Sequence, residues 1–157
     1  MKEVLAIDPG NIESAYVVMD YETYKPLRFG KIPNEEFIDL LKTMCDSTLP
    51  AVVIEMIASY GMPVGKEVFD TCVWIGRFYE AVSGAQLMFR KDVKMNMCNS
   101  TKAKDGNIIQ ALKDRFGDKG TKTNPGWFYG FKADCWQAYA LGVTYIDKLK
   151  EKNNVEI

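Results

Sequence analysis

The stretch Val4-Leu5-Ala6-Ile7-Asp8-Pro9-Gly10-Asn11 joins a short apolar run to a strong turn signal. Four apolar residues in succession are typical of a strand buried on both faces, and the Pro-Gly-Asn sequence then ends that strand. Two further strands are expected over residues 14–19 and 27–32, separated by a hairpin turn over 20–25. Together they predict an antiparallel three-strand meander, in which Asp8 stands at the end of the central strand.

A helix and a second fully apolar strand follow the meander. Asn34 is expected to be the N-cap of the helix, since apolar residues recur at helical spacing after it. The apolar strand over residues 51–54 then runs directly into Glu55. Because a helix separates this strand from the meander, a parallel pairing with the first strand is expected, and it would place Glu55 beside Asp8.

The remaining elements alternate between helix and strand. We expect an amphipathic helix over 66–83, a strand over 85–89, a helix over 100–116 that Gly117 ends, a loop over 117–131 and a closing helix over 133–150. The apolar positions of helix 66–83 are spread over two faces, which predicts packing on the sheet and on a second copy of the chain. Charged replacements of Ile75 or Phe78 are expected to disrupt that dimer. Periodicity alone supports an α/β class with one mixed sheet.

Three carboxylates, Asp8, Glu55 and Asp134, are placed where two adjacent strands and the last helix would bring them together. Two of them have a simpler interpretation: Asp8-Pro9-Gly10 is a good turn by itself, and Asp134 favours the helix dipole. Glu55 is harder to explain that way, because a glutamate after four apolar residues is costly to bury without a partner. The sequence has no histidine, so an oxygen-only site for Mg²⁺ or Mn²⁺ is expected, with phosphate chemistry. Glu13, Glu67 and Asp70 are weaker candidates.

Composition and charge place the protein among ordinary globular domains. The 157 residues fit one domain over 1–157, with 47% hydrophobic and 26% charged side chains. With no signal-peptide region and no run long enough to span a bilayer, a cytoplasmic protein without a membrane partner is expected. The four cysteines have no metal-binding spacing and are expected to be reduced and mostly buried.

The net charge of −1 hides a strong asymmetry along the chain. Residues 1–85 carry seven basic and 13 acidic side chains, whereas residues 86–132 carry ten basic and four acidic ones. A basic block beside a carboxylate cluster is typical of an enzyme that acts on a polyanion, although lysines that only solvate a helix and a loop would give the same pattern.

The order of elements resembles the ribonuclease H-like fold: a five-stranded mixed sheet, made of the meander plus two parallel strands and flanked by helices. Within it, three segments resemble the signature segments of the RuvC-like Holliday-junction resolvases. They are Ala6-Ile7-Asp8-Pro9-Gly10, Val53-Ile54-Glu55 and Lys132-Ala133-Asp134-Cys135-Trp136-Gln137-Ala138-Tyr139-Ala140-Leu141. The segments Lys91–Lys94 and Ser100–Asp105 resemble the part of the family before and into the penultimate helix. The compact size resembles the bacteriophage branch, which would act in the host cytoplasm.

The resemblance implies a homodimeric, magnesium-dependent endonuclease that resolves four-way DNA junctions in recombination and repair, with 5′-phosphate products. It implies that Asp8, Glu55 and Asp134 hold two Mg²⁺ ions, with Mn²⁺ as a substitute and Asp8 as the bridging ligand. The family's fourth acid corresponds to Gln137 here. Because an amide is neutral, the catalytic set carries one negative charge fewer, and whether the site binds a second metal ion is left open.

Residues that contact DNA are expected in the basic block and in one loop. The expected phosphate contacts are the following lysines: Lys66, Lys91, Lys94, Lys102, Lys104 and Lys132. Tyr60 follows a catalytic strand and is expected to stack on an unpaired base. Four aromatic residues near Lys132 could also stack on bases: Trp127, Phe128, Tyr129 and Phe131. For two or three of them we favour a structural role, in which they pack together and anchor the long loop. Asp105 either starts a helix or lies near the substrate.

Other functions compete with junction resolution. A less selective flap, fork or RNA–DNA hybrid nuclease would use the same fold. A catalytically weak or inactive branched-DNA-binding module is also open, because Gln137 replaces an acid. An actin-like phosphotransferase also begins with a strand and an aspartate-glycine turn, but the chain lacks a second phosphate-binding repeat.

Overall fold

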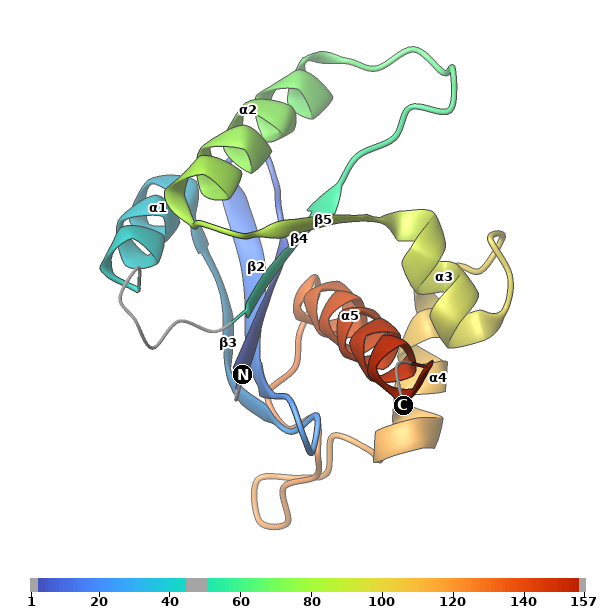
Figure 1. The fold of residues 1–157 in the computed structure, drawn as a ribbon. Helices are drawn as coiled ribbons and strands as arrows, with labels where there is room; N and C mark the ends of the chain where they lie inside the picture. Colours follow the sequence, from blue (N-terminus) through green and yellow to red (C-terminus); the bar gives the residue numbers. More distant parts are fainter. Residues whose placement is uncertain (1–2, 45–50, 156–157) are drawn as a thin grey trace.

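The computed structural model describes residues 3–44 and 51–155 of the chain (Figure 1). Its elements in chain order are β1 (Glu3–Asp8), β2 (Glu13–Asp20), β3 (Pro26–Pro33), α1 (Asn34–Thr43), β4 (Ala51–Met56), α2 (Lys66–Ala81), β5 (Gln86–Phe89), α3 (Arg90–Cys98), α4 (Asp105–Phe116) and α5 (Cys135–Val155). Within the described residues, none of the helices combines the length and apolar character that crossing a membrane requires.

The strands form one mixed sheet in the order β3-β2-β1-β4-β5. β2 pairs antiparallel with both β1 and β3, whereas β4 pairs parallel with β1 and with β5. The predicted meander, the parallel pairing of the second apolar strand and the α/β class are therefore confirmed.

Helices cover both faces of the sheet. Helix α5 packs on one face against β1, β2 and β4, with α3 and α4 beside it, and α1 and α2 cover the other face (Figure 1). Alternate residues of β1 divide between the two layers: Val4 and Ala6 pack on the α5 side, and Leu5 and Ile7 pack on the α1 and α2 side. By the same alternation, Asp8 faces the α5 side at the end of the strand.

Several elements begin or end away from their expected positions. Helix α3 was not expected, because only Val93 of its nine residues is buried and no apolar periodicity marks it. Helix α4 begins at Asp105 rather than at Ser100, and Gly117 ends it as predicted, with a positive φ of 121°. The closing helix extends to Val155.

The expected N-cap role of Asn34 is wrong. Pro33 occupies the N-cap position of α1 without a side-chain hydrogen bond, and Asn34 is buried with its amide group directed to other partners. A proline carbonyl can begin the helix because the cap residue needs only an extended backbone, which leaves the asparagine side chain free for tertiary contacts.

The expectation for Ile75 and Phe78 is also wrong. Both side chains are buried in the core between α2 and the sheet, so they cannot form a surface for a second chain. The exposed face of α2 carries Phe69, Val73 and Tyr79 instead. Sequence periodicity showed two apolar faces but could not tell which one the sheet would cover.

Of the cysteines, Cys72, Cys98 and Cys135 are free thiols, but only Cys135 is buried, so the expectation of mostly buried thiols is not met among these three. Cys45 lies outside the described residues.

Aromatic packing anchors the loop that precedes α5. Phe128 and Phe131 are fully buried, and the Trp127 ring stacks on Phe116 with centroids 5.5 Å apart. Tyr129 alone of the four clustered aromatic residues is exposed. The loop is thus pinned to the core on the α5 side, and this packing holds Asp134 at the start of α5 in a defined place.

Candidate active site

Asp8 lies in a row of residues that crosses three strands. It pairs with Ala15 of β2, and Ala15 pairs with Lys31 of β3. Residues opposite one another in neighbouring strands project to the same face of a sheet. Asp8, Ala15 and Lys31 therefore share the face on which α5 packs, and the small Ala15 side chain between them leaves room for the long lysine.

Glu55 extends this row on the other side of Asp8. The registered pairs Ala6–Val53 and Ile7–Ile54 bring Glu55 next to Asp8 at the carboxyl ends of β1 and β4. Val53 packs on the α5 side, so Glu55, two residues further along, faces that side as well. The Glu55 side chain is largely buried, with 17% of its surface exposed.

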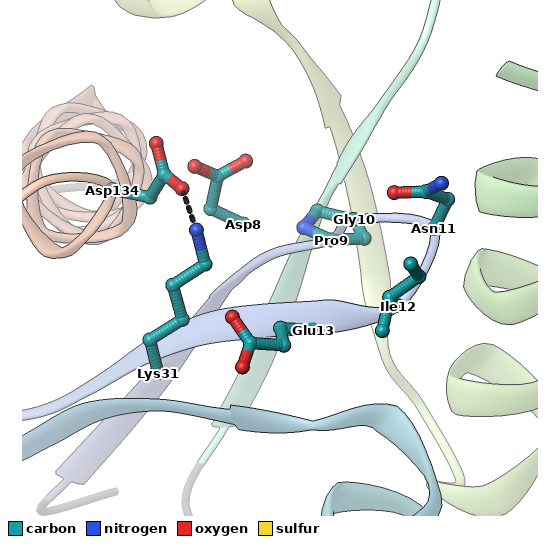
Figure 2. A pocket seen from close by; sticks show the side chains of 8 residues that line it. All are labelled: Asp8, Pro9, Gly10, Asn11, Ile12, Glu13, Lys31 and Asp134. Carbon is teal, nitrogen blue, oxygen red and sulfur yellow. Dashed lines mark hydrogen bonds and ion pairs between the residues drawn. The ribbon is translucent and has the colours of Figure 1, made fainter. Parts of the chain in front are cut away.

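Asp134 reaches the same place from the start of α5. Its backbone carbonyl accepts hydrogen bonds from the amides of Gln137 and Ala138, which begin the helix. Its carboxylate accepts a hydrogen bond of 2.7 Å from the Lys31 ammonium, and Figure 2 shows the Asp8 and Asp134 side chains projecting into one space that Lys31 enters from below. A cavity of about 570 Å³ opens here, lined by the turn from Asp8 to Glu13, by Lys31 and by Asp134.

The electrostatics of the cluster are dominated by Asp8. Burial, followed by the charges of Glu55 and Asp134, raises the pKa of Asp8 to about 8. A side-chain hydrogen bond with Glu55 raises the pKa of Asp8 further. Burial also raises the pKa of Glu55, against the opposing charge of Arg90.

Two basic side chains flank the acids. Arg90 contacts the Glu55 carboxylate at 3.6 Å and also pairs with Asp105. Lys31 pairs with Asp134 at the opposite end of the row, and this hydrogen bond raises the pKa of the lysine, with further contributions from the charges of Asp134, Glu13 and Asp8. The outer acids Glu55 and Asp134 are thus each paired with a cation, whereas the central Asp8 has no ion pair among the described residues and has a raised pKa.

A buried polar network holds the turn after Asp8. Asn34 donates a hydrogen bond to the carbonyl of Gly10 at 2.8 Å and accepts one from the Ser14 hydroxyl at 2.6 Å. The amide of Gly10 donates to the same hydroxyl at 3.2 Å. A side chain on Gly10 would collide with the carbonyl of Glu13, so only glycine fits this turn.

The acids have the chemistry of a site for a hard divalent cation. Asp8, Glu55 and Asp134 offer only oxygen donors, and a divalent ion would offset both the burial and the mutual repulsion that raise the pKa of Asp8. Gln137, one helical turn after Asp134, has a buried Oε1 without a hydrogen-bond partner. Across residues 3–44 and 51–155, however, no group of three or more acidic, cysteine or histidine side chains has the spacing of an ion-binding cluster. The donor set fits Mg²⁺ or Mn²⁺, and the ligand roles remain a prediction.

Comparison with solved structures identifies the architecture. The structure of RuvC from Thermus thermophilus matches with a TM-score of 0.69 and 15% identity, over 96% of both chains. The structure of T. thermophilus RuvC in complex with a Holliday junction substrate matches with a TM-score of 0.66 and 15% identity, over 92% of both chains. The chain has a RuvC-like fold. No family model matches the sequence, and no curated protein matches it.

A basic cavity lies next to the acids of this RuvC-like fold. It has a volume of about 360 Å³ and is lined by Tyr60, Arg90, Lys91, Lys94 and Thr101. Tyr60 is 67% exposed and has a positive φ of 51°, which presents its ring at the surface of the loop after β4. Arg90 belongs to this cavity and also contacts Glu55, so it joins the basic cavity to the acidic cluster.

The other predicted DNA contacts are more scattered. Lys102, Lys104 and Lys132 are exposed without an ion pair in the described structure, whereas Lys66 pairs with Asp70 on the surface of α2 at 2.6 Å. Of the weaker acidic candidates, Glu13 lines the cavity beside Asp8 and Asp134, Glu67 is exposed and Asp70 pairs with Lys66.

Sequence reasoning missed Lys31, Arg90 and Asn34. Arg90 carries a usable signal, since it directly follows β5, the strand beside the one that bears Glu55. Lys31 carries none, because its role depends on the register of three strands.

Proposed function

We propose that this protein is a metal-dependent endonuclease that resolves four-way DNA junctions by paired phosphodiester hydrolysis. The observation that carries the proposal is the convergence of Asp8, Glu55 and Asp134 at one end of a RuvC-like sheet, where burial and the two neighbouring acids raise the pKa of Asp8 to about 8. The solved neighbour that holds a Holliday junction substrate supports branched DNA as the substrate.

Each residue of the site has a role in the proposed reaction. Divalent ions held by Asp8, Glu55 and Asp134 would supply an activated water and stabilise the leaving 3′ oxygen, which gives 5′-phosphate ends. Arg90, Lys91 and Lys94 would bind the phosphates on either side of the scissile bond, because they line one cavity next to Glu55. Tyr60 would stack on a base that is unpaired at the junction centre.

Junction resolution also requires two cuts related by symmetry, and we propose a two-fold dimer through the exposed face of α2. Phe69 and Val73 are each about 60% exposed, and Tyr79 on the same helix is also exposed. Gly76 has no heavy atom within 4 Å of the place where a Cβ would lie, which allows another backbone to approach closely. Val73→Asp is expected to give a folded monomer that nicks junctions without paired cutting, as measured by light scattering and by a plasmid cruciform assay. A dimeric Val73→Asp protein with paired cuts would refute this interface.

The decisive experiment compares cleavage of a synthetic four-way junction with cleavage of three-way, flap and RNA–DNA hybrid substrates in Mg²⁺. Wild type is expected to cut the four-way junction preferentially, whereas Asp8→Asn and Glu55→Gln are expected to bind it without cutting. Preferential cutting of flaps or hybrids would replace junction resolution with the broader nuclease.

A junction-binding module without catalysis is the second candidate, and the unpartnered Oε1 of Gln137 favours it, since an amide stands where the family has an acid. This candidate predicts tight junction binding by wild type with no cleavage in Mg²⁺ or Mn²⁺. It further predicts that Gln137→Asp gains cleavage, a result that would also identify the missing charge as the reason for inactivity.

A further inference from the structure

Lys31 is the one basic side chain among the described residues that lines the catalytic cavity itself. Its ammonium lies 2.7 Å from the Asp134 carboxylate, and Asp8 and Glu13 line the same cavity (Figure 2). Arg90 stands on the opposite flank and lines the separate basic cavity. Lys31 is therefore the cation positioned to compete directly with a divalent ion.

The reach of Lys31 is built into the sheet. Neighbouring strands lie about 4.8 Å apart, so Lys31 and Asp8, two strands apart, are separated by roughly 10 Å of backbone. The lysine side chain extends toward Asp8 over the small, buried Ala15, and its ammonium reaches the Asp134 carboxylate. The Lys31 side chain keeps 40% of its surface exposed, so it can also turn outward to solvent or to a bound polyanion.

We propose that Lys31 is a positioning residue that exchanges partners during loading of the site: it pairs with Asp134 in the metal-free protein, gives up this carboxylate to a divalent ion, and then contacts a DNA phosphate. The inference rests on the proposed function, since it takes the ligands of the site to be a divalent ion and DNA. Both transfers keep the ammonium paired with an anionic oxygen, and neither transfer requires a change in the sheet.

The exchange predicts effects of opposite sign for Lys31→Met. Without DNA, loss of the competing cation raises the affinity for a divalent ion by up to about fivefold, the upper end of the range for a partly exposed ion pair. With the ion present, loss of one phosphate contact weakens DNA binding. It also makes the fall of the logarithm of the DNA-binding constant with the logarithm of salt concentration less steep, by about 0.9. A lysine that only stabilised the fold would not move the two affinities in opposite directions.

The experiment uses Mn²⁺ titrations followed by electron paramagnetic resonance, and junction binding by fluorescence anisotropy in Ca²⁺ over a range of salt concentrations. The variants are Lys31→Met, Lys31→Arg and Asp8→Asn. Arg28→Met is the matched control, because Arg28 also lies on β3 and pairs with an acid, Glu3, at the far end of the strand. Lys31→Arg is expected to retain junction affinity, and Arg28→Met to leave Mn²⁺ affinity at the wild-type value.

The outcomes separate this inference from the proposed function. If Asp8→Asn abolishes Mn²⁺ binding while Lys31→Met leaves the Mn²⁺ affinity of wild type unchanged, the exchange is refuted and the nuclease stands. If Asp8→Asn binds Mn²⁺ as wild type does, the metal site of the proposed function fails and the inference fails with it. Tighter Mn²⁺ binding and weaker junction binding by Lys31→Met, against an unchanged Arg28→Met, support the exchange.

Discussion

Replacing Asp8 by asparagine should stabilise the metal-free protein and remove most of the pH dependence of its stability. Burial and the neighbouring acids raise the pKa of Asp8 from 3.8 to about 8. Between these two values the folded state holds a proton that the unfolded state has released, so stability falls as pH rises. Asparagine imitates the protonated acid at every pH, and its variant should not show this fall.

The magnitude follows from linkage. One proton difference changes the free energy of unfolding by about 1.4 kcal/mol per pH unit, so wild type should lose at most about 3 kcal/mol between about pH 5 and about pH 7. This is an upper value because solvent still reaches the cavity beside Asp8. No histidine titrates in this pH range, since the sequence has none. Glu55, whose pKa burial also raises, is the other acid of the cluster that contributes to the same fall. The lowered pKa values of Asp20 and Asp147 act below about pH 4, where stability is lost as those groups become protonated.

The assay is urea unfolding in chelator across this pH range. Glu55→Gln should flatten the profile in part, because burial raises the pKa of Glu55 in the same direction. Asp39→Asn, on the exposed surface of α1, serves as the control and should keep the wild-type slope. Adding Mg²⁺ at about 100 times its Kd should stabilise wild type by about 2.7 kcal/mol and leave Asp8→Asn unchanged. Equal pH slopes for wild type and Asp8→Asn would refute the raised pKa of Asp8.

Three further predictions concern the residues that surround the acids. Asn34→Ala should lower the free energy of unfolding by about 1–3 kcal/mol in urea titrations, since it leaves the Gly10 carbonyl without its buried partner. Gln137→Glu should destabilise the metal-free protein above neutral pH and raise the number or affinity of bound Mn²⁺ ions; calorimetry that shows neither effect would place Gln137 outside the site. Asp147→Asn should cost about 2–4 kcal/mol of stability, because Arg115, Tyr24 and Asn96 all donate to this carboxylate, while junction cleavage at low temperature should persist.

The strand order and the convergence of the acids could be predicted because they depend on local signals. Two continuous apolar runs, ended by Asp8 and Glu55, indicated buried parallel strands. A carboxylate at the end of a buried strand is costly to bury without a partner, which indicated a site. The aromatic loop was also predicted correctly in outline, since a cluster of large apolar side chains next to a helix start is expected to pack.

The features that sequence reasoning missed depend on long-range geometry. Lys31 meets Asp134 only through the register of three strands, and no local pattern encodes that register. Asn34 looked like a helix cap, but its amide group is bound by the Asp8–Gly10 turn, which lies far away in the sequence. Ile75 and Phe78 were assigned to the wrong face because an all-round apolar helix does not reveal which side meets the sheet.

In the proposed function, acids from three separate segments of the chain together hold divalent ions. A crystal structure of wild type soaked in Mn²⁺, with anomalous diffraction data, tests it most directly. We expect at least one anomalous peak coordinated by Asp8 together with Glu55 or Asp134, and no peak in Asp8→Asn. The absence of a peak in wild type at saturating Mn²⁺, or a peak bound by other residues, would contradict it.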